Sequence, residues 1–363
     1  MNTEYAFGYI CRNFTISTLF IFSVNAISAE PGSHKELTQY LDEVRGESAI
    51  PAMAVAVITA GKVSYIEGFG YLDEKLTKPT TDKTLFRAAS ISKLFTAQAI
   101  MKLVERRKLS LDDEVGLYIP QLEKSQITIK QLLTHSSGLT DVIRPVSVKQ
   151  GRSLKRYLEL VRGAVPEESE SHSFVYSDTN YNLLGEIILS VSGQRYDAFI
   201  YDNIFKPAKI RKSHFYDGSN ENFAETHPTY RGKLIDKLEQ RPYDLAFNPS
   251  EGLIANVYDL SQWLTLTLNH APVILDKQSF DAMLVPQVKT TWGEIYMALG
   301  WQVYENEYGK VARHPGSVRG YKSLVLTYPD SKNAIIILSN SSDTPRWEIA
   351  KSITEILNKT GEW

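Results

Sequence analysis

A serine and a lysine three residues apart, Ser90 and Lys93, are the residues whose types and spacing point most directly to chemistry. Residues 94–105, which follow them, predict a long amphipathic helix with small and apolar side chains on its inner face. Residues three apart share one face of a helix, so the amine of Lys93 can reach the hydroxyl of Ser90. A serine hydroxyl is a good nucleophile only when a base takes its proton, and a desolvated lysine can help to do so. The helix N-terminus would also favour developing negative charge at Ser90.

The same pair also has a purely structural interpretation. Ser90 would then be the N-cap of the helix, and Lys93 would be a solvated residue in its first turn. The spacing alone does not separate the two interpretations, so the rest of the chain has to decide between them.

Two later segments carry polar residues in a matching order. One contains Y-S-D beginning at Tyr176, and the other contains H-P-G beginning at His314, between two strand-like runs. Together with Ser90 and Lys93 they resemble the three signatures of the serine β-lactamase and penicillin-binding protein superfamily. The branch with Tyr-x-Asn as its middle element is the most similar: class C β-lactamases, D,D-carboxypeptidases, D-aminopeptidases and related esterases. Residues 129–139 and 251–260 resemble two further segments of that branch.

The resemblance implies a role for each matched residue. Ser90 would attack a carbonyl and carry the acyl group, while Lys93 would keep the proton-transfer network poised. Tyr176 would act as general base in acylation and as general acid to the leaving group, its phenolate favoured by the adjacent positive charge. The backbone N–H groups of Ser90 and Ser317 would form the oxyanion hole. Gly316 would leave the strand open to the substrate.

Asp178 departs from the family pattern, which most often has an asparagine at this place. An ionised carboxylate accepts hydrogen bonds but cannot donate them, so a donor to the substrate is lost. The carboxylate also adds a negative charge beside Lys93. We expect Asp178 to hold Lys93 protonated, which leaves Tyr176 as the base.

His314 is a second departure, because the penicillin-recognising form of this motif has a lysine. Histidine is mostly neutral near pH 7, whereas lysine brings a full charge for a substrate carboxylate. The change favours an esterase, an amidase or a D-amino-acid peptidase over an efficient β-lactamase. Arg319 either restores the carboxylate clamp or is a solvated turn residue. Asn340, at the end of a strand near the expected cleft, is a further candidate for substrate contact.

Strand-like runs lie near both ends of the chain, and helix and loop lie between them. Residues 52–58 and 63–71 predict a hairpin, and 84–89 read as an approach loop. The other runs are strands at 297–304, 311–314, 321–328 and 334–338, and helices at 37–44 and 347–357.

The resemblance implies an α/β fold of the α+β type, similar to β-lactamases and transpeptidases. An antiparallel sheet from both chain ends would be flanked by helices, with a mainly helical region inserted. We assign residues 30–89 and 291–363 to the sheet region and 90–290 to the helical region. Together they would form one catalytic domain, with the site in the crevice between them.

Composition narrows the possible partners and compartments. The 363 residues carry a formal net charge of −2 without basic runs, so there is no electrostatic footprint for nucleic acid. No zinc-protease, phosphate-loop or dinucleotide motif occurs, so we expect neither a metal nor a cofactor.

His135 and the serines after it are not interpreted as a triad, because no G-x-S-x-G elbow surrounds them. We expect His135 to be a hydrogen-bonded structural residue instead.

The N-terminal residues 1–29 predict a secretory signal. An apolar run at 14–24 precedes small residues, with cleavage expected near Ala29, so we expect a secreted or periplasmic protein. An uncleaved membrane anchor is the alternative, although the run is shorter than the ~20 residues that span a bilayer. Cys11, the only cysteine, lies in this segment, which excludes a cysteine nucleophile in the mature protein.

These observations lead to one functional prediction with two alternatives. We predict an exported serine hydrolase that forms an acyl-enzyme with a small-molecule or peptide substrate, either an ester or an amide of the D-amino-acid type. A penicillin-binding D,D-carboxypeptidase or β-lactamase is the alternative within the enzyme class. A catalytically weak binding or sensor protein is the alternative from another class. Asp178 favours that alternative, whereas the joint presence of Ser90, Lys93, Tyr176 and Gly316 argues against it.

Overall fold

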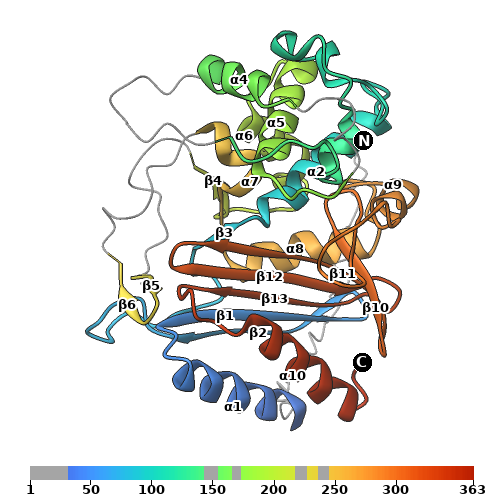
Figure 1. The fold of residues 1–363 in the computed structure, drawn as a ribbon. Helices are drawn as coiled ribbons and strands as arrows, with labels where there is room; N and C mark the ends of the chain where they lie inside the picture. The colour runs from blue at the N-terminus through green and yellow to red at the C-terminus, as the bar shows by residue number, and fades with distance from the viewer. Residues whose placement is uncertain (1–31, 143–153, 166–172, 217–226, 236–244) are drawn as a thin grey trace, which may run out of the picture.

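An eight-stranded antiparallel sheet built from both ends of the chain organises the protein (Figure 1). The structure is a computed structural model, and it describes residues 32–142, 154–165, 173–216, 227–235 and 245–363. The strand order is β2-β1-β13-β12-β11-β10-β9-β8, so the pairing of β1 with β13 joins the two chain ends. The strands are β1 (Ala52–Thr59), β2 (Lys62–Gly70), β8 (Val288–Lys289), β9 (Tyr296–Met297), β10 (Gln302–Asn306), β11 (Gly309–Val318), β12 (Tyr321–Tyr328) and β13 (Asn333–Ser339).

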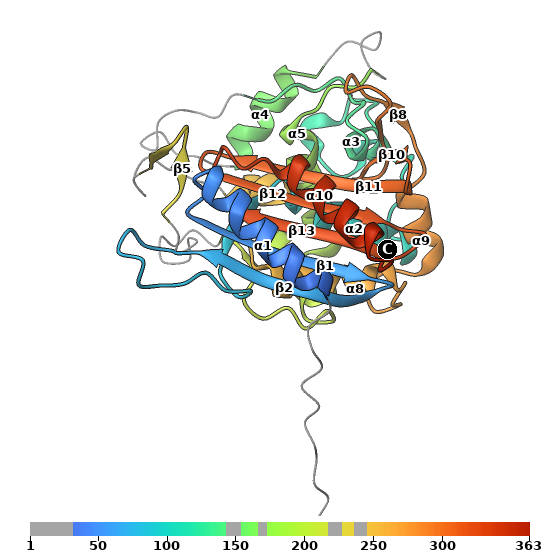
Figure 2. The same ribbon diagram turned by 90° about the horizontal axis from the view of Figure 1, so that it is seen from below.

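Both faces of this sheet are covered. Side chains of a strand alternate between its faces, and in β1 they alternate between two apolar cores, with Ala54 and Ala56 in one and Val55 and Val57 in the other. Helices α1 (Gly32–Glu47) and α10 (Arg346–Lys359) contact each other and cover one face (Figure 2). Helix α8 (Val257–Leu268) covers the other face together with the helical region. The predicted fold class is therefore confirmed.

The helical region lies on the side of the sheet opposite to α1 and α10 (Figure 1). Its helices are α2 (Ser92–Glu105), α3 (Ile129–Leu133), α4 (Leu154–Gly163), α5 (Asp178–Ser192), α6 (Tyr196–Ile200), α7 (Asn248–Glu251) and α9 (Lys277–Met283). Shorter helical turns are η1 (Val115–Leu117), η2 (Pro120–Leu122), η5 (Tyr201–Phe205) and η8 (Leu245–Phe247). Two short strands, β5 (Thr229–Tyr230) and β6 (Lys233–Leu234), form a separate hairpin.

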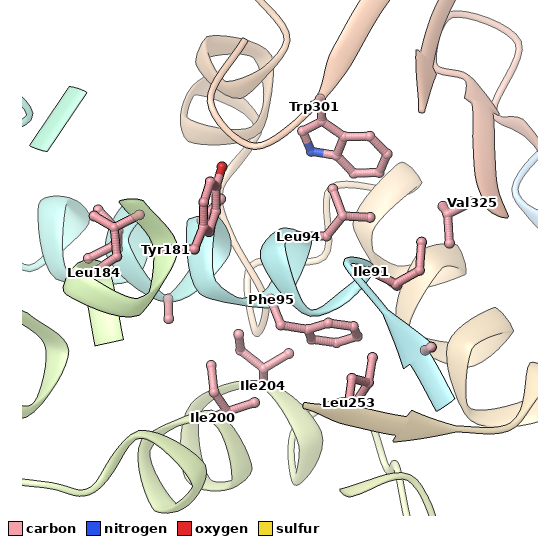
Figure 3. Packing of buried hydrophobic residues seen from close by; sticks show 14 of the residues in the cluster. Ile91, Leu94, Phe95, Tyr181, Leu184, Ile200, Ile204, Leu253, Trp301 and Val325 are labelled. Carbon is pink, nitrogen blue, oxygen red and sulfur yellow. The ribbon is translucent and has the colours of Figure 1, made fainter. Parts of the chain in front are cut away.

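Helix α2 is the centre of the molecule. Every residue from Ser92 to Leu103 is buried, so the helix is enclosed on all sides rather than along the single inner face that we predicted. Figure 3 shows Phe95 packing against Ile200, Ile204 and Leu253. A helix that is enclosed in this way holds the side chains at its N-terminus in fixed positions.

Two local predictions differ from the structure. Residues 84–89, expected as a loop, contain β3 (Phe86–Ala89), which pairs with β7 (Leu253–Ala255) in a three-stranded sheet completed by β4 (His214–Phe215). The run 297–304, expected as one strand, is split between β9 and β10. Gly300 between them has a φ of +88°, and a Cβ there would lie 2.5 Å from the Cβ of Ala97. The chain turns tightly against α2 at this point.

The membrane and signal predictions depend mainly on residues 1–29, which lie outside the described residues. In the described part of the chain, no helix combines the length and the apolar character that a membrane span requires.

Candidate active site

Ser90 lies in the tight turn between β3 and α2. Ala89, immediately before it, has a φ of +51°, a left-handed conformation that is uncommon for a residue with a side chain. The hydroxyl of Ser92 donates to the Ala89 carbonyl at 2.7 Å and accepts from the N–H of Leu253 at 2.9 Å. The N-cap residue of α2 is Ile91, and no side chain caps the helix there. The turn therefore projects Ser90 ahead of the helix and does not use its hydroxyl as an N-cap.

Lys93 is the centre of the polar network. Its side chain is fully buried, which rules out the interpretation as a solvated residue. Its Nζ lies 3.1 Å from Ser90 Oγ, 2.6 Å from Asp178 Oδ1 and 2.8 Å from the carbonyl oxygen of Ser250 in α7. The carboxylate and the carbonyl can only accept, so two of the lysine N–H groups are committed to them. The third position of the amine faces Ser90.

The charge on Lys93 is decided by its neighbours. Burial by itself lowers the pKa of this lysine, but the Asp178 carboxylate and Tyr176 outweigh it, so the pKa lies above its ordinary value. Lys93 is therefore an ammonium ion at neutral pH. All three of its N–H groups then act as donors, and the one that faces Ser90 stabilises negative charge on the serine oxygen.

Tyr176 and Asp178 are positioned by the turn at the start of α5. Ser177 is the N-cap of α5 and accepts from the N–H of Thr179 at 3.2 Å. Asp141 Oδ1 accepts from the N–H of Asp178 at 2.6 Å and from the hydroxyl of Ser177 at 3.1 Å. This capping arrangement fixes the two residues on either side of Ser177. The tyrosine and the aspartate therefore both approach Lys93.

Tyr176 lies against both Lys93 and two histidines. Lys93 Nζ is 5.2 Å from the centroid of its ring, His135 stacks on the ring at 4.3 Å, and the ring of His314 is 6.4 Å away. Burial raises the pKa of the Tyr176 phenol, and contacts with Lys93 and Ser90 offset only part of that rise. The adjacent positive charge lowers the pKa as expected, but burial contributes more, so the pKa of the phenol lies above its ordinary value.

His135 supports the segment that carries Tyr176. It is fully buried, and its Nδ1 lies 3.2 Å from both the N–H of Ser177 and the amide nitrogen of Asn180. Its carbonyl accepts from the N–H of Val175 at 2.9 Å. Burial, and next the charge of Lys93, hold the pKa of His135 well below its usual range, so the imidazole is neutral. His135 is a hydrogen-bonded structural residue, as we predicted. The sequence did not indicate that its ring stacks on the ring of Tyr176.

Strand β11 brings His314 and Gly316 to the same site. His314 is fully buried, and burial together with Lys93 lowers its pKa to about 3. Its Nδ1 lies 2.8 Å from the Pro315 carbonyl, so Nδ1 carries the proton and Nε2 presents a lone pair. Nε2 has no hydrogen-bond partner among the described residues.

The structure explains the glycine at position 316 by close packing, whereas we expected it to leave the strand open to the substrate. A Cβ at this position would lie 2.1 Å from Ser323 Oγ and 2.3 Å from the carbonyl oxygen of Ala88 in β3. Ser323 Oγ itself donates to that carbonyl at 2.7 Å. The glycine therefore allows β11 and β12 to approach the turn that carries Ser90. This approach packs β11, which contains Ser317, against β3, which precedes Ser90. The role of the two backbone N–H groups as an oxyanion hole stays a prediction.

Sequence reasoning missed Arg346, which begins α10. Its Nη1 donates to the carbonyl of Gly316, to Ser317 Oγ at 3.1 Å and to the carbonyl of Ser323 at 3.2 Å. Burial and the nearby Arg313 lower its pKa to about 10, which leaves it charged at neutral pH. No motif marks this arginine, and only the packing of α10 against β12 reveals it.

Two further residues that we predicted to contact substrate, Asn340 and Arg319, have other contacts in the structure. Asn340 is fully buried, and its amide accepts from the N–H of Ala52 at 2.8 Å and donates to the carbonyl of His227 at 3.0 Å. The prediction that it contacts substrate is wrong, because the amide joins β13 to neighbouring main chain. Arg319 lies in the exposed turn after β11, with its guanidinium over the ring of Tyr230 at 5.3 Å. The cation that reaches Gly316 is Arg346.

Trp292 is a second residue that the sequence did not mark. It lies between β8 and β9, with its ring 4.8 Å from that of Phe174 and 5.8 Å from that of Tyr176.

As for metals, within the described ranges no group of three histidine, cysteine, aspartate or glutamate side chains is arranged to hold an ion.

A serine at the head of an enclosed helix, with a sheet built from both chain ends beside it, is the arrangement that the resemblance to serine β-lactamases and penicillin-binding proteins implies. The chain belongs to the Beta-lactamase family, whose family model matches residues 37–355.

Known relatives agree with this assignment at low identity. The chain is 26% identical over 341 residues to Protein flp of Staphylococcus aureus (strain MW2), covering 90% of this chain and 66% of that protein. It is 28% identical over 354 residues to Penicillin-binding protein 4* of Bacillus subtilis (strain 168), covering 88% and 75%. The chain thus spans about two thirds of the length of flp.

Solved structures show the same fold. The octameric penicillin-binding protein homologue from Pyrococcus abyssi superposes with a TM-score of 0.76 at 29% identity, covering 90% of this chain and 77% of that one. A class C β-lactamase superposes with a TM-score of 0.77 at 21% identity, covering 91% and 98%.

Proposed function

We propose that this protein is a serine hydrolase that forms an acyl-enzyme at Ser90, acting on an ester or on an amide of the D-amino-acid type. The observation that carries the proposal is the bond from the buried Lys93 ammonium to Ser90 Oγ, at 3.1 Å. A buried charge is costly unless it is paired and hydrogen-bonded, and this one has the Asp178 carboxylate as its partner. A hydroxyl that receives such a donor is prepared to carry negative charge.

Tyr176 is the proposed route for the proton of Ser90. A protonated Lys93 has no lone pair and cannot act as the base. The phenol holds its own proton at rest, so it works as a relay: it accepts the Ser90 proton while passing its own proton to the leaving atom. The Ser90 oxygen bonds to the acyl carbon, and the bond from that carbon to the leaving group breaks. Tyr176 ends this step as a neutral phenol, ready for the second step.

Deacylation runs the same relay with water. The water oxygen bonds to the acyl carbon as its proton passes to Tyr176, and the phenol proton passes to Ser90 Oγ as the serine ester bond breaks. The N–H groups of Ser90 and Ser317 stabilise the oxyanion in both steps. Removing one such donor from an oxyanion hole costs about 10²–10³ in turnover.

His314 and Arg346 guide the choice of substrate. The neutral His314 brings no charge for a carboxylate, which supports a neutral ester or amide. Arg346 supplies a cation at the carbonyl of Gly316, which supports the alternative of a penicillin-binding D,D-carboxypeptidase or β-lactamase. The two candidates therefore differ in whether Arg346 binds a substrate carboxylate.

The test is the intact mass of the protein after exposure to three probes: a penicillin, a short-chain activated ester and a D-alanyl-D-alanine mimic. Each probe is run in parallel on the Ser90→Ala variant. We expect an acyl adduct in the unaltered protein that the variant lacks, and the probe that forms it identifies the substrate class. If an adduct persists in the variant, Ser90 is not the nucleophile. If no probe gives an adduct or is turned over, the catalytically weak binding or sensor protein becomes the better explanation.

We also propose that the protein is exported through residues 1–29. The apolar run and the small residues near Ala29 support this proposal. The N-terminal sequence of the protein from a cell fractionation tests it. A chain that begins after Ala29 and lies outside the cytoplasm is expected, whereas a membrane-bound chain that keeps residues 1–29 would indicate an anchor.

A further inference from the structure

Trp292 is the exposed ring beside the proposed proton relay. Among the described residues, the rings that contact Tyr176 are those of His135, His314 and Trp292. The two histidines are fully buried, whereas Trp292 is 41% exposed. Among these three neighbours of Tyr176, Trp292 is therefore the one whose ring is accessible to solvent.

The loop that carries this tryptophan is braced by contacts within its own hairpin. Thr290 Oγ1 accepts from the N–H of Trp292 at 3.1 Å and donates to the carbonyl of Ile295 at 2.7 Å. Lys289 and Glu294 form an ion pair of 2.8 Å across the same hairpin. The indole also packs edge-on against Phe174, which belongs to the segment that carries Tyr176. The sheet and the helical region thus meet at this ring.

The exposed part of the Trp292 indole offers an apolar aromatic surface on which a second ring can pack. In the proposed reaction, the leaving atom receives its proton from Tyr176, so the leaving group lies beside the phenol during acylation. Trp292 is a neighbour of that phenol on the accessible side. A flat leaving group in this place can stack on the indole or meet its edge, at the 4.5–7 Å centroid separations that aromatic pairs prefer.

We propose that Trp292 is a specificity-determining residue that binds an aromatic or flat apolar leaving group, so that preferred substrates are aryl esters or amides with such a group on the departing side. The proposal rests on the proposed function of Ser90 and Tyr176. It assigns the indole to the departing half of the substrate and not to the acyl half.

A pair of esters with one common acyl group tests the assignment. One has phenol as its leaving group, and the other has an aliphatic fluoroalcohol of similar acidity. We compare Trp292→Ala and Trp292→Phe with Tyr258→Ala, a control on α8 whose ring is also 41% exposed. The measurements are kcat/KM for each ester and the decay rate of the shared acyl-enzyme, followed by intact mass.

We expect Trp292→Ala to lower kcat/KM about five- to tenfold for the phenyl ester, the size of one aromatic contact, and less than twofold for the fluoroalkyl ester. Trp292→Phe should restore most of the loss, and Tyr258→Ala should change neither ester. The decay of the acyl-enzyme should stay the same in every variant, because the leaving group has already departed.

Equal losses for both esters, or no loss for either, would overturn the assignment. A changed decay rate of the shared acyl-enzyme would show that the indole acts on the second step, on the acyl half or through Tyr176, and would also overturn the assignment. Those outcomes leave the proposed function intact. If the unaltered protein turns over the esters without forming an adduct at Ser90, the proposed function fails, and the inference fails with it.

Discussion

Lys93 and Asp178 form an ion pair of 2.6 Å in which the lysine side chain is fully buried and the carboxylate keeps 23% of its exposure. The lysine side chain is thus removed from water, whereas the carboxylate of Asp178 still contacts water. This relationship fixes the charge state of the amine beside Ser90. It also makes the chemistry depend on a residue at which the chain departs from the pattern of its family.

The first prediction concerns Asp178→Asn. The amide still accepts from Lys93, but the negative charge is lost, so the pKa of the lysine should fall. If activity requires the Lys93 ammonium, the basic limb of the pH profile of kcat/KM should move to lower pH. Profiles of both proteins over pH 6–11 measure the shift. An unchanged basic limb would remove the role that we assign to the carboxylate.

The same pair predicts a stability effect in Asp178→Ala. The folded-state pKa of Lys93 is raised, so its contribution to stability is complete below the ordinary lysine pKa and is lost as pH rises through the folded-state value. At pH 7 the variant buries an unpaired ammonium, and its free energy of unfolding should fall by about 3–5 kcal/mol. Urea unfolding at pH 7 measures the loss. Asp281→Ala, which breaks an exposed pair with Lys277, is the control and should cost less than about 1 kcal/mol.

His314 should make the protein less stable in mild acid. Its pKa is about 3 in the folded state and near 6.5 in the unfolded chain, so the unfolded chain binds the proton first. The free energy of unfolding should therefore fall as pH drops from about 6.5 towards 3. For His314 this amounts to about 2–3 kcal/mol at pH 4.5. In His314→Gln, the difference between urea unfolding at pH 7.5 and at pH 4.5 should shrink by that amount, and an unchanged difference would contradict the neutral histidine.

Arg346→Gln should separate the two substrate candidates. A charged guanidinium strengthens a hydrogen bond to a carboxylate more than a neutral amide does. If the substrate carries a carboxylate at this place, kcat/KM should fall about tenfold or more for an ester with a carboxylate, and little for its neutral counterpart. Equal effects on both esters would assign Arg346 to holding β11. Thermal melting of the variant shows whether the strand is disturbed.

Gly316→Ala should damage the site through packing. Its Cβ would meet Ser323 Oγ and the Ala88 carbonyl at distances that real side chains do not adopt. We expect a loss of about 1–3 kcal/mol in the free energy of unfolding, the usual cost of overpacking, together with a large loss of activity. Gly46→Ala, with nothing within 4 Å of its Cβ, is the control and should be neutral or stabilising. An active Gly316→Ala protein would contradict the contact.

The order of the motifs was enough to predict the fold class, because the strand-like runs near both chain ends and the resemblance agree. It was not enough to predict β3, since a four-residue strand has no periodicity of its own and is stabilised by pairing with β7. The prediction that Asp178 binds Lys93 follows from the resemblance, which places the two residues in one site, together with their opposite charges. The structure places the two groups in contact. Their catalytic roles, and that of Tyr176, remain predictions.

The residues that sequence reasoning missed or misplaced depend on tertiary packing. Arg346 and Trp292 reach the site from a helix and a hairpin that carry no motif. Asn340 failed as a substrate contact because a buried amide at a strand end binds the neighbouring main chain. The raised pKa of Tyr176 was not expected, because the contribution of burial cannot be read from the adjacent charge.

The contact of Ala88 with Gly316 and Ser323 joins two parts of the chain that are 235 residues apart at Ser323. The two amide groups of the predicted oxyanion hole flank this contact, one on each part. Neither the sheet nor the helical region contains the complete hole. The predicted hole therefore requires the turn that carries Ser90 and the C-terminal strands to be packed against each other, and a change at either part of the chain would separate its two amide groups.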